Sequence, residues 1–420
     1  MTTTVAPSNE MSPRSPRVSP PSRLHSVDIL RGLIMIIMAL DHARDIFYRG
    51  SALGDPELLA DPGAALFFTR WITHFCAPLF VFLAGTGAFL SLGRGRTRKE
   101  LSWFLVTRGF WLIVLEFTLV KFGWIFSFTM QFNIAQVIFA LGVSMIVLAA
   151  LIWLPMWAIV AFGALMVLGH NALDGLVVGT GDPNAFGPGS GPIPVGQLGF
   201  WNTLWAFLHV PNLLQLPNGW LLLVRYPLIP WIGVMALGYT LGPLLQRPDE
   251  ERRRTLLRLG LALTAAFILL RLANIYGDPR AWSVRGDVMD TIIAFLNTQK
   301  YPPSLLFLLM TLGPGIALLP LLERWTGPVA NFVEIFGRVP LFFYLLHVPL
   351  LRVIASVIAI VMLGPDAVRP GQLGPPPGFG FDLPVVYLIW VVAIALLYLP
   401  CKWFAGLKAR RRDWKWLSYL

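Results

Sequence analysis

The sequence predicts an all-α fold, a polytopic bundle of about ten transmembrane helices with both termini in the cytoplasm. Hydrophobic residues make up 56% of the 420 residues and charged residues only 13%, whereas about 25% of a soluble protein is charged. The mean hydropathy is +0.67. The apolar runs are continuous over helical lengths, while a transmembrane β-barrel alternates in strands of about ten residues. Soluble, disordered, disulfide-stapled and β-barrel classes are therefore excluded.

Residues 1–24 are rich in Pro, Ser and Arg and contain no apolar stretch, which is typical of a disordered tail and not of a cleavable signal peptide. We expect residues 25–404 to form the membrane domain and residues 405–420 a basic cytoplasmic tail. A span needs about 20 apolar residues to cross roughly 30 Å of hydrocarbon. Ten segments come close to this length: 28–47, 71–92, 103–122, 134–152, 155–170, 221–242, 255–275, 303–322, 339–362 and 385–404.

The weakest boundary lies between the fourth and fifth spans, because only Trp153 and Leu154 separate them. If this pair crossed the bilayer only once, every later span would reverse its direction. We also expect loop 171–220, whose second half is rich in Trp and Phe, to pack across the outer mouth of the bundle.

The net charge of +11 comes from 33 Lys and Arg against 22 Asp and Glu. The basic residues form short clusters between spans, on one side of the membrane under the ten-span count, so they indicate topology and no nucleic-acid partner. The positive-inside rule places both termini in the cytoplasm, and the 16 tryptophans suit interfacial anchoring. We expect a multi-pass protein of the inner (plasma) membrane, in contact with the lipid bilayer. Its oligomeric state stays open, a homo-oligomer included.

Six ionisable residues lie in the first span: Asp28, Arg31, Asp41, His42, Arg44 and Asp45. Ionisable groups inside a span are costly and face a cavity or a partner. Arg31 and His42 are eleven residues apart, so they fall within about 20° of one helix face and about 16 Å apart along the axis. We interpret this stripe as one side of a hydrated passage. The alternative is a polar seam that holds helices together.

An imidazole beside a carboxylate provides a general base with an orienting partner. We therefore predict catalytic roles for His42, Asp41 and His74, since His74 opens the second span at the depth of His42. The alternative for His74 is an interfacial histidine with one hydrogen bond. We expect Arg108 and Glu116 to pair with each other, and Arg271 and Asn274 to reach outward to water.

Several signatures are missing. The sequence has no Walker loop, no His-Glu-x-x-His motif and no Gly-x-Ser-x-Gly elbow. Cys76 and Cys401 indicate neither a disulfide framework nor a metal site, and no metal is predicted. Gly85 and Gly87 lie inside a span, where glycines let helices approach closely.

Several motifs resemble the heparan-α-glucosaminide N-acetyltransferase-like proteins. The most specific runs from Arg23 through Asp28 to Gly32 and continues to Asp41-His42. Other matching pieces, in the same order, are 74–85, 226–233, 300–304 and 336–347. The resemblance covers residues 23 to about 404 and implies a membrane acyltransferase of ten or eleven helices. Such a protein takes an acetyl group from acetyl-CoA and delivers it to a sugar amine or hydroxyl on the far side of the membrane.

The resemblance also implies roles for single residues. Arg31 and His42 match the Arg, ten residues, His pattern of related membrane acyltransferases that modify bacterial surface glycans. The lysosomal N-acetyltransferase has asparagine at the place of His42 and a histidine in the following loop, whereas this sequence has no histidine between 43 and 73. The resemblance therefore supports acyl transfer in general more than N-acetylation of glucosamine.

We expect acyl-CoA as the donor, bound with the help of Arg31, Asp28 and His347, because its phosphates are attracted to guanidinium groups. The expected acceptor is a saccharide or cell-envelope glycan. We prefer direct transfer with His42 as base over an acyl-histidine intermediate, since water in the passage would hydrolyse the acyl-imidazole.

Two other functions fit part of the pattern. A proton-coupled transporter would use His42, Asp41 and Asp45, but the inverted repeats typical of many transporters are not evident. A non-catalytic membrane partner would not require the Arg31–His42 stripe. Binding of acetyl-CoA discriminates the enzyme from both.

Overall fold

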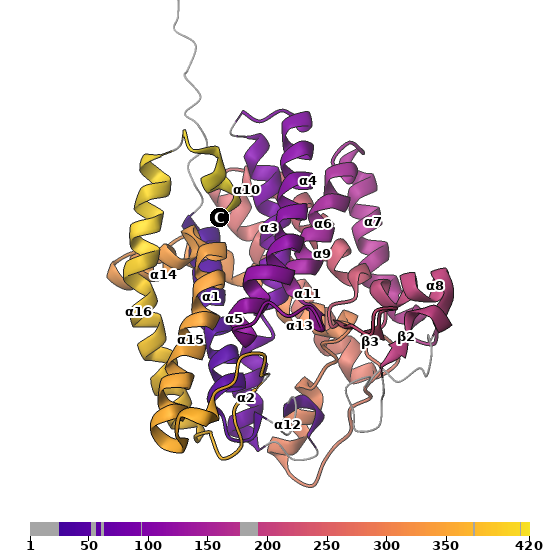
Figure 1. Cartoon of the computed structure of the whole chain (residues 1–420). Coiled ribbons are helices and arrows are strands. Elements are labelled where there is room, and N and C mark those ends of the chain that lie inside the picture. Colours follow the sequence, from indigo (N-terminus) through magenta and orange to yellow (C-terminus); the bar gives the residue numbers. More distant parts are fainter. Residues whose placement is uncertain are drawn as a thin grey trace, which may run out of the picture.

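Long helices that run roughly along one axis make up most of the structure, which is a computed structural model (Figure 1). It describes residues 25–51, 56–59, 63–93, 95–176, 192–372, 374–411 and 413–420. The predicted tail 1–24 lies outside the described residues. The helices at the predicted spans are α1 (His25–Phe47), α2 (Ala64–Thr73) with α3 (Cys76–Leu92), α4 (Arg98–Leu115) with α5 (Lys121–Ile125), α6 (Val137–Leu151), α7 (Met156–Gly169), α9 (Leu228–Thr240) with α10 (Gly242–Leu245), α11 (Asp249–Ala273), α13 (Leu305–Leu322), α15 (Pro340–Leu363) and α16 (Leu383–Arg410).

The prediction of long apolar helices is confirmed. In the described part of the chain, eight helical segments are long and apolar enough to cross a membrane. Two further helices stand at predicted spans without meeting that measure. One is α6, which has 15 residues, and the other is α1, which carries the five charged residues of the first span.

The remaining helices are shorter and lie between the long ones. They are α8 (Val195–Leu208), α12 (Val288–Leu296), α14 (Pro328–Arg338) and the single turns η2 (Pro56–Leu58), η4 (His170–Leu173), η5 (Pro365–Ala367) and η6 (Lys415–Tyr419). A π-helical turn, η3 (Glu116–Val120), joins α4 to α5.

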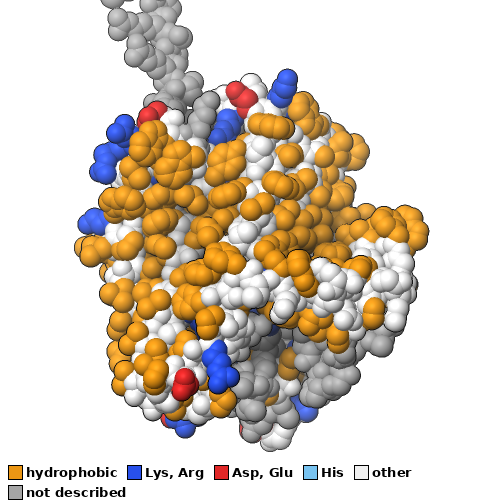
Figure 2. Space-filling view, in the orientation of Figure 1, with side chains coloured by type: hydrophobic (Ala, Val, Ile, Leu, Met, Phe, Trp, Pro, Cys, Tyr) orange, Lys and Arg blue, Asp and Glu red, His pale blue; other side chains and the backbone are white. Residues whose placement is uncertain are grey.

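Apolar side chains cover the middle of the molecule's surface. Figure 2 shows them as a broad band on the visible face, with Lys, Arg, Asp and Glu mainly toward the two ends. Among the candidate spans α9 and α13 are the most enclosed, whereas α7, α11 and α16 bury the smallest share of their residues. The bundle therefore has central helices and an outer ring that suits contact with lipid.

Small residues allow the helices to approach closely. A Cβ added at Gly85 of α3 would lie 2.1 Å from the carbonyl oxygen of Met235 in α9, and one at Gly238 would lie 2.0 Å from that of Phe82. Gly109 of α4 and Gly142 of α6 face each other in the same way. The predicted packing role of Gly85 is confirmed, while Gly87 has only one atom within 4 Å, at 3.8 Å.

A small sheet corrects the all-α prediction. Its strands are β1 (Phe132–Ala135), β2 (Ile193–Pro194), β3 (Asn212–Gln215) and β4 (Leu221–Val224), in the order β1-β4-β3-β2. β4 pairs parallel to β1 and antiparallel to β3. The predicted spans 134–152 and 221–242 therefore begin as strands. Pro227 explains the second case, because a residue that precedes proline disfavours the helical conformation.

Two segments, loop 171–220 and the tail 405–420, differ from their predicted structures. α8 lies beside the bundle and not across its centre (Figure 1), with Phe200 and Trp201 exposed; residues 177–191 of that loop lie outside the described residues. In the predicted basic tail, α16 continues to Arg410, and residues 413–420 fold back so that Leu417 is buried.

Candidate active site

Two imidazoles from distant parts of the chain meet inside the bundle. His42 comes from the C-terminal half of α1 and His347 from the second turn of α15. The Nδ1 atom of His42 lies 2.6 Å from the Nε2 atom of His347, and the rings stack with their centroids 4.9 Å apart. His347 is fully buried. This His42–His347 pair joins α1 to α15.

The hydrogen bonds fix which nitrogen carries the proton. The Nδ1 atom of His347 lies 3.1 Å from the carbonyl oxygen of Phe343, and since a carbonyl only accepts, this nitrogen donates. In a neutral ring the Nε2 atom of His347 is then an acceptor, so His42 donates to it from Nδ1. The Nε2 atom of His42 keeps its lone pair. The geometry therefore assigns to His42 the tautomer that a general base requires.

Trp124 forms one wall of the pair. Its ring meets that of His42 edge-on, with the centroids 5.0 Å apart. It belongs to α5, directly after the π-helical turn η3, and such turns are frequent at functional sites. Gly123 lets α5 pack against Pro349 of α15, because an added Cβ would lie 3.1 Å from that ring. Trp124 also lines a cavity with Glu116, Lys121 and Gln136, and neither histidine of the pair is part of its lining.

Asp41, predicted to orient His42, is engaged by arginines instead. Its carboxylate accepts hydrogen bonds from Arg70 of α2 at 2.5 and 2.7 Å and from Arg44 at 3.2 Å. Arg44 also donates to Asp45 at 2.6 Å. Both guanidinium groups are buried. These four residues, the Asp41 ion cluster, tie α1 to α2.

His74 follows α2 and is buried against α13. Its ring lies 5.2 Å from that of Phe307, and its side chain is buried. The imidazole that bonds to His42 comes from α15 instead. The sequence thus indicated that a second histidine stands near His42, but His347 was assigned to donor binding.

Arg31 and Asp28 lie at the opposite end of α1. Arg31 donates to the Asp28 carboxylate at 3.2 Å, and to the carbonyl oxygens of Gly337 and Leu83 at 3.5 Å. Buried side chains of Ile34, Met35 and Met38 occupy α1 between Arg31 and His42. The predicted hydrated passage between the two residues is therefore closed by packing in this structure.

Two predictions outside the site, the Arg108–Glu116 pair and the outward reach of Arg271, are wrong. Arg108 donates to the carbonyl oxygen of Ser418, whereas Glu116 accepts from the backbone N–H of Phe139 at 2.9 Å. An Arg108–Glu116 pair would lie along one helix, but each side chain finds a partner on another segment. Arg271 does not reach outward, because its side chain is buried.

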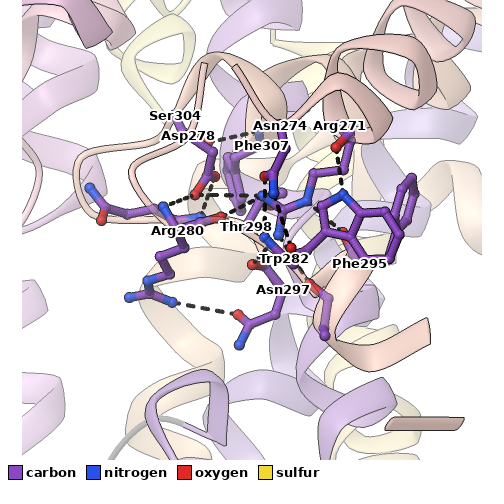
Figure 3. A network of polar contacts seen from close by, with 12 residues as sticks. Arg271, Asn274, Asp278, Arg280, Trp282, Phe295, Asn297, Thr298, Ser304 and Phe307 are labelled. Carbon is purple, nitrogen blue, oxygen red and sulfur yellow. Dashed lines mark hydrogen bonds and ion pairs between the residues drawn. The ribbon is translucent and has the colours of Figure 1, made fainter. Parts of the chain in front are cut away.

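A second polar cluster holds the loop between α11 and α13 (Figure 3). Arg271 donates to the carbonyl oxygens of Arg280, Ala294, Phe295 and Asn297. Asp278 accepts from Ser304 at 2.6 Å and from the backbone N–H groups of Gln299 and Arg280 at 2.8 Å. Burial raises the pKa of the Asp278 carboxyl above its ordinary value despite these bonds. Since these bonds fix the loop internally, we assign the cluster a structural role.

Comparison with known protein families shows to which family this chain belongs. The family model described as heparan-alpha-glucosaminide N-acetyltransferase, catalytic, matches residues 23–272. The chain belongs to this family. The match includes α1 with Arg31, Asp41 and His42, and α2 with His74. Among curated proteins, no match to the chain is found.

The family match ends before α15, so His347 lies outside the matched residues. Sequence reasoning could not pair His347 with His42, because 305 positions separate them and no local spacing records the contact. Arg70 was missed as well, although a single arginine in an apolar run is a signal that a buried partner exists. Trp124 gave no signal among 16 tryptophans.

Proposed function

We propose that this protein moves an acetyl or short acyl group from cytoplasmic acyl-CoA to an amine or hydroxyl of a saccharide on the extracytoplasmic side of the inner membrane. The family membership supports acetyl transfer. The observation that carries the proposal is the His42–His347 pair, in which the Nε2 atom of His42 keeps a free lone pair.

The reaction needs one base and one path for its proton. The Nε2 atom of His42 takes the proton from the acceptor amine or hydroxyl while that group attacks the thioester carbonyl. The carbon–sulfur bond then breaks, and the imidazolium returns the proton to the leaving thiolate. Acid–base assistance of this kind contributes roughly 10²–10⁴-fold. His347 acts as a positioning residue, since it holds the tautomer of His42 without touching the substrates.

The two substrates arrive from opposite faces in this proposal. The ten-span topology puts the basic ends of α1, α4 and α14 in the cytoplasm, where the anionic donor is found. His42 lies in the outer half of α1, closer to the acceptor side. Because apolar side chains fill the face between Arg31 and His42, turnover requires a rearrangement that admits the thioester.

The test is acyl transfer by purified protein in nanodiscs. Labelled acetyl-CoA is the donor, and methyl glucosaminide, which offers both an amine and hydroxyls, is the test acceptor. We expect His42→Ala to abolish transfer while the variant stays folded and inserted. His25→Ala is the matched control, because His25 opens the same helix with an exposed side chain that bonds to Glu334 at 3.0 Å. Near wild-type turnover by His42→Ala would remove His42 from the mechanism.

A proton-coupled transporter is the competing outcome of the same preparation. The Asp41 ion cluster and the His42–His347 pair place ionisable groups inside the bundle, as a proton relay would. Proton uptake into liposomes that depends on His42, without any acetyl transfer or acetyl-CoA binding, would favour that function over ours.

A further inference from the structure

Residues 413–420 cover one end of the bundle, the end that we propose to be cytoplasmic. Figure 1 shows the end of the chain turned back toward the bundle near α1 and α10, and Tyr419 contacts Phe104 of α4. Leu417 is only 2% exposed and belongs to the main hydrophobic core. This segment, which we name the covering segment, is therefore packed into the bundle and does not extend into water.

The covering segment lies on a surface formed by Phe104 and two arginines. Tyr419 packs edge-on against the Phe104 ring, with the centroids 5.6 Å apart, and its hydroxyl lies 2.7 Å from that of Thr107. Arg96 lies over the same Phe104 ring at 4.2 Å. Arg108 donates to the carbonyl oxygen of Ser418. The segment thus presents an aromatic ring and a hydrogen-bond acceptor to this surface.

Positive charge is concentrated beneath the segment. The guanidinium groups of Arg96 and Arg108 lie over the same Phe104 ring, at 4.2 and 5.7 Å from its centroid. Within the described residues Arg31 forms an ion pair with Asp28, whereas neither Arg96 nor Arg108 forms one with a carboxylate. The nearby Glu100 carboxylate is bound by the backbone and hydroxyl of Thr97. Like charges this close repel unless an anion joins them, and guanidinium groups bind phosphate oxygens especially well.

We propose that Arg31, Arg96, Arg108 and Phe104 form the site for the phosphorylated adenosine end of the donor, and that the covering segment holds this site closed. The inference rests on the proposed function. The segment imitates the ligand, since Tyr419 takes the place of the adenine ring on Phe104 and the Ser418 carbonyl that of a phosphate oxygen on Arg108. Donor binding displaces the segment, and the segment limits access to the face of α1 that leads to His42.

The two events are linked thermodynamically. If CoA and the covering segment compete for one site, CoA increases the exposure of the segment, and removal of the segment raises the affinity for CoA by a matching factor. The competition predicts effects of about tenfold, within the 5–150-fold range typical of coupled sites.

Cysteine labelling measures the displacement directly. Leu417→Cys is expected to react slowly with a maleimide in phosphatidylcholine nanodiscs and about tenfold faster with saturating CoA. Trp416→Cys is the matched control, because the neighbouring side chain is 53% exposed and should react equally with and without CoA. The unsubstituted protein gives the background from buried Cys76 and Cys401. Nanodiscs with phosphatidylglycerol and no CoA test whether a lipid phosphate displaces the segment instead.

Affinity measurements complete the test. A chain that lacks residues 413–420, and independently Tyr419→Ala, should bind CoA more tightly, whereas Arg108→Gln should bind it more weakly. The inference is overturned if CoA binds but leaves Leu417→Cys labelling unchanged, if phosphatidylglycerol alone gives the full effect, or if CoA binds to neither form. CoA-dependent opening without any acyl transfer would contradict only the proposed function. Transfer without CoA-dependent opening would contradict only this inference.

Discussion

His42 illustrates how a single hydrogen bond decides the chemistry of a side chain. An isolated imidazole exchanges its proton between two nitrogens, and only one tautomer leaves Nε2 as the base. The Phe343 carbonyl fixes His347, and His347 fixes His42. The base is thus set by a chain of two bonds that ends at a helix backbone.

His347 can be tested as a positioning residue. We expect His347→Phe to lower kcat by roughly 10²-fold, at the lower end of acid–base effects, and to leave the KM for acetyl-CoA unchanged. His347→Gln should restore part of kcat, because its side-chain oxygen can accept the hydrogen bond that His42 donates from Nδ1. The pH profile of kcat is the decisive measurement, since a merely structural role would lower activity without shifting it.

The Asp41 ion cluster is expected to be essential for stability. Arg70→Gln leaves buried charge on Asp41 with one partner fewer, which costs about 3–5 kcal/mol in comparable buried pairs. The double variant Asp41→Asn with Arg70→Gln should recover most of that loss, measured as the thermal unfolding midpoint in detergent. Arg49→Gln is the control, because the Arg49–Asp382 pair is exposed and such pairs contribute about 0–1 kcal/mol. Equal losses for Arg70→Gln and Arg49→Gln would contradict this role.

Asp278, in the polar cluster of Figure 3, is expected to make the stability of the protein depend on pH. Its folded-state pKa is raised by burial, so between the unfolded and the folded pKa the folded state binds more protons. Its contribution to stability is therefore largest at acidic pH and declines as pH rises through that window. Asp278→Asn should flatten this part of the stability curve, followed by unfolding at a series of pH values. An unchanged slope would show that Asp278 does not titrate on unfolding.

At the scale of elements, the site depends on how closely helices approach. α15 reaches His42 because Gly123 accepts Pro349. α14 packs on α1 where Gly337 meets the backbone of Asp28, with an added Cβ only 1.8 Å from the carbonyl oxygen. Side chains larger than hydrogen at these positions would separate the helices that carry the functional residues.

The α3–α9 contact allows a matched test of this packing. Gly85→Ala puts a methyl group against the backbone of α9, and overpacking of this kind costs about 1–3 kcal/mol. Gly87→Ala, two residues later in the same helix, meets only the end of the Arg31 side chain at 3.8 Å and should be nearly neutral. Thermal unfolding of both variants in one detergent checks the difference. Equal stability would show that α3 and α9 can separate freely.

At the scale of the whole molecule, the direction of each span decides which substrate reaches which face. In the part of the chain that the structure describes, eight helical segments meet the length and hydropathy requirement, and the crossings of α1 and α6 remain to be tested. The α6–α7 pair matters most, because a single crossing there reverses every helix that follows.

Two exposed arginines on opposite sides of the ten-span topology report the answer. Arg285→Cys should react with an impermeant maleimide in intact cells, since it lies in the outer loop between α11 and α13. Arg324→Cys, in the turn after α13, should react only after permeabilisation. Exchange of the two results would mean that the helices after α7 run opposite to the ten-span topology.

The local features of this protein could be predicted from its sequence, whereas contacts between distant segments could not. Hydropathy located the spans within a few residues, except where β4 occupies Leu221–Val224 and α9 begins only at Leu228, after Pro227. The Arg31–His42 spacing predicted that the two side chains share a face of α1, because helical periodicity is a local property. Arg108 and Glu116 show the limit, since both have partners on segments that the periodicity of α4 does not encode.

The sequence by itself showed that this is a helical membrane protein, and it pointed to a family whose motif begins in α1. It also predicted which ends of the helices face the cytoplasm. Only the tertiary structure decided that His42 bonds to His347, that Asp41 binds Arg70, and that residues 413–420 close the end of the bundle. The physical reason is that a membrane span depends on the total hydrophobicity of about 20 consecutive residues, which can be read directly along the chain. A hydrogen bond instead depends on two atoms that the folded chain brings within about 3 Å of each other.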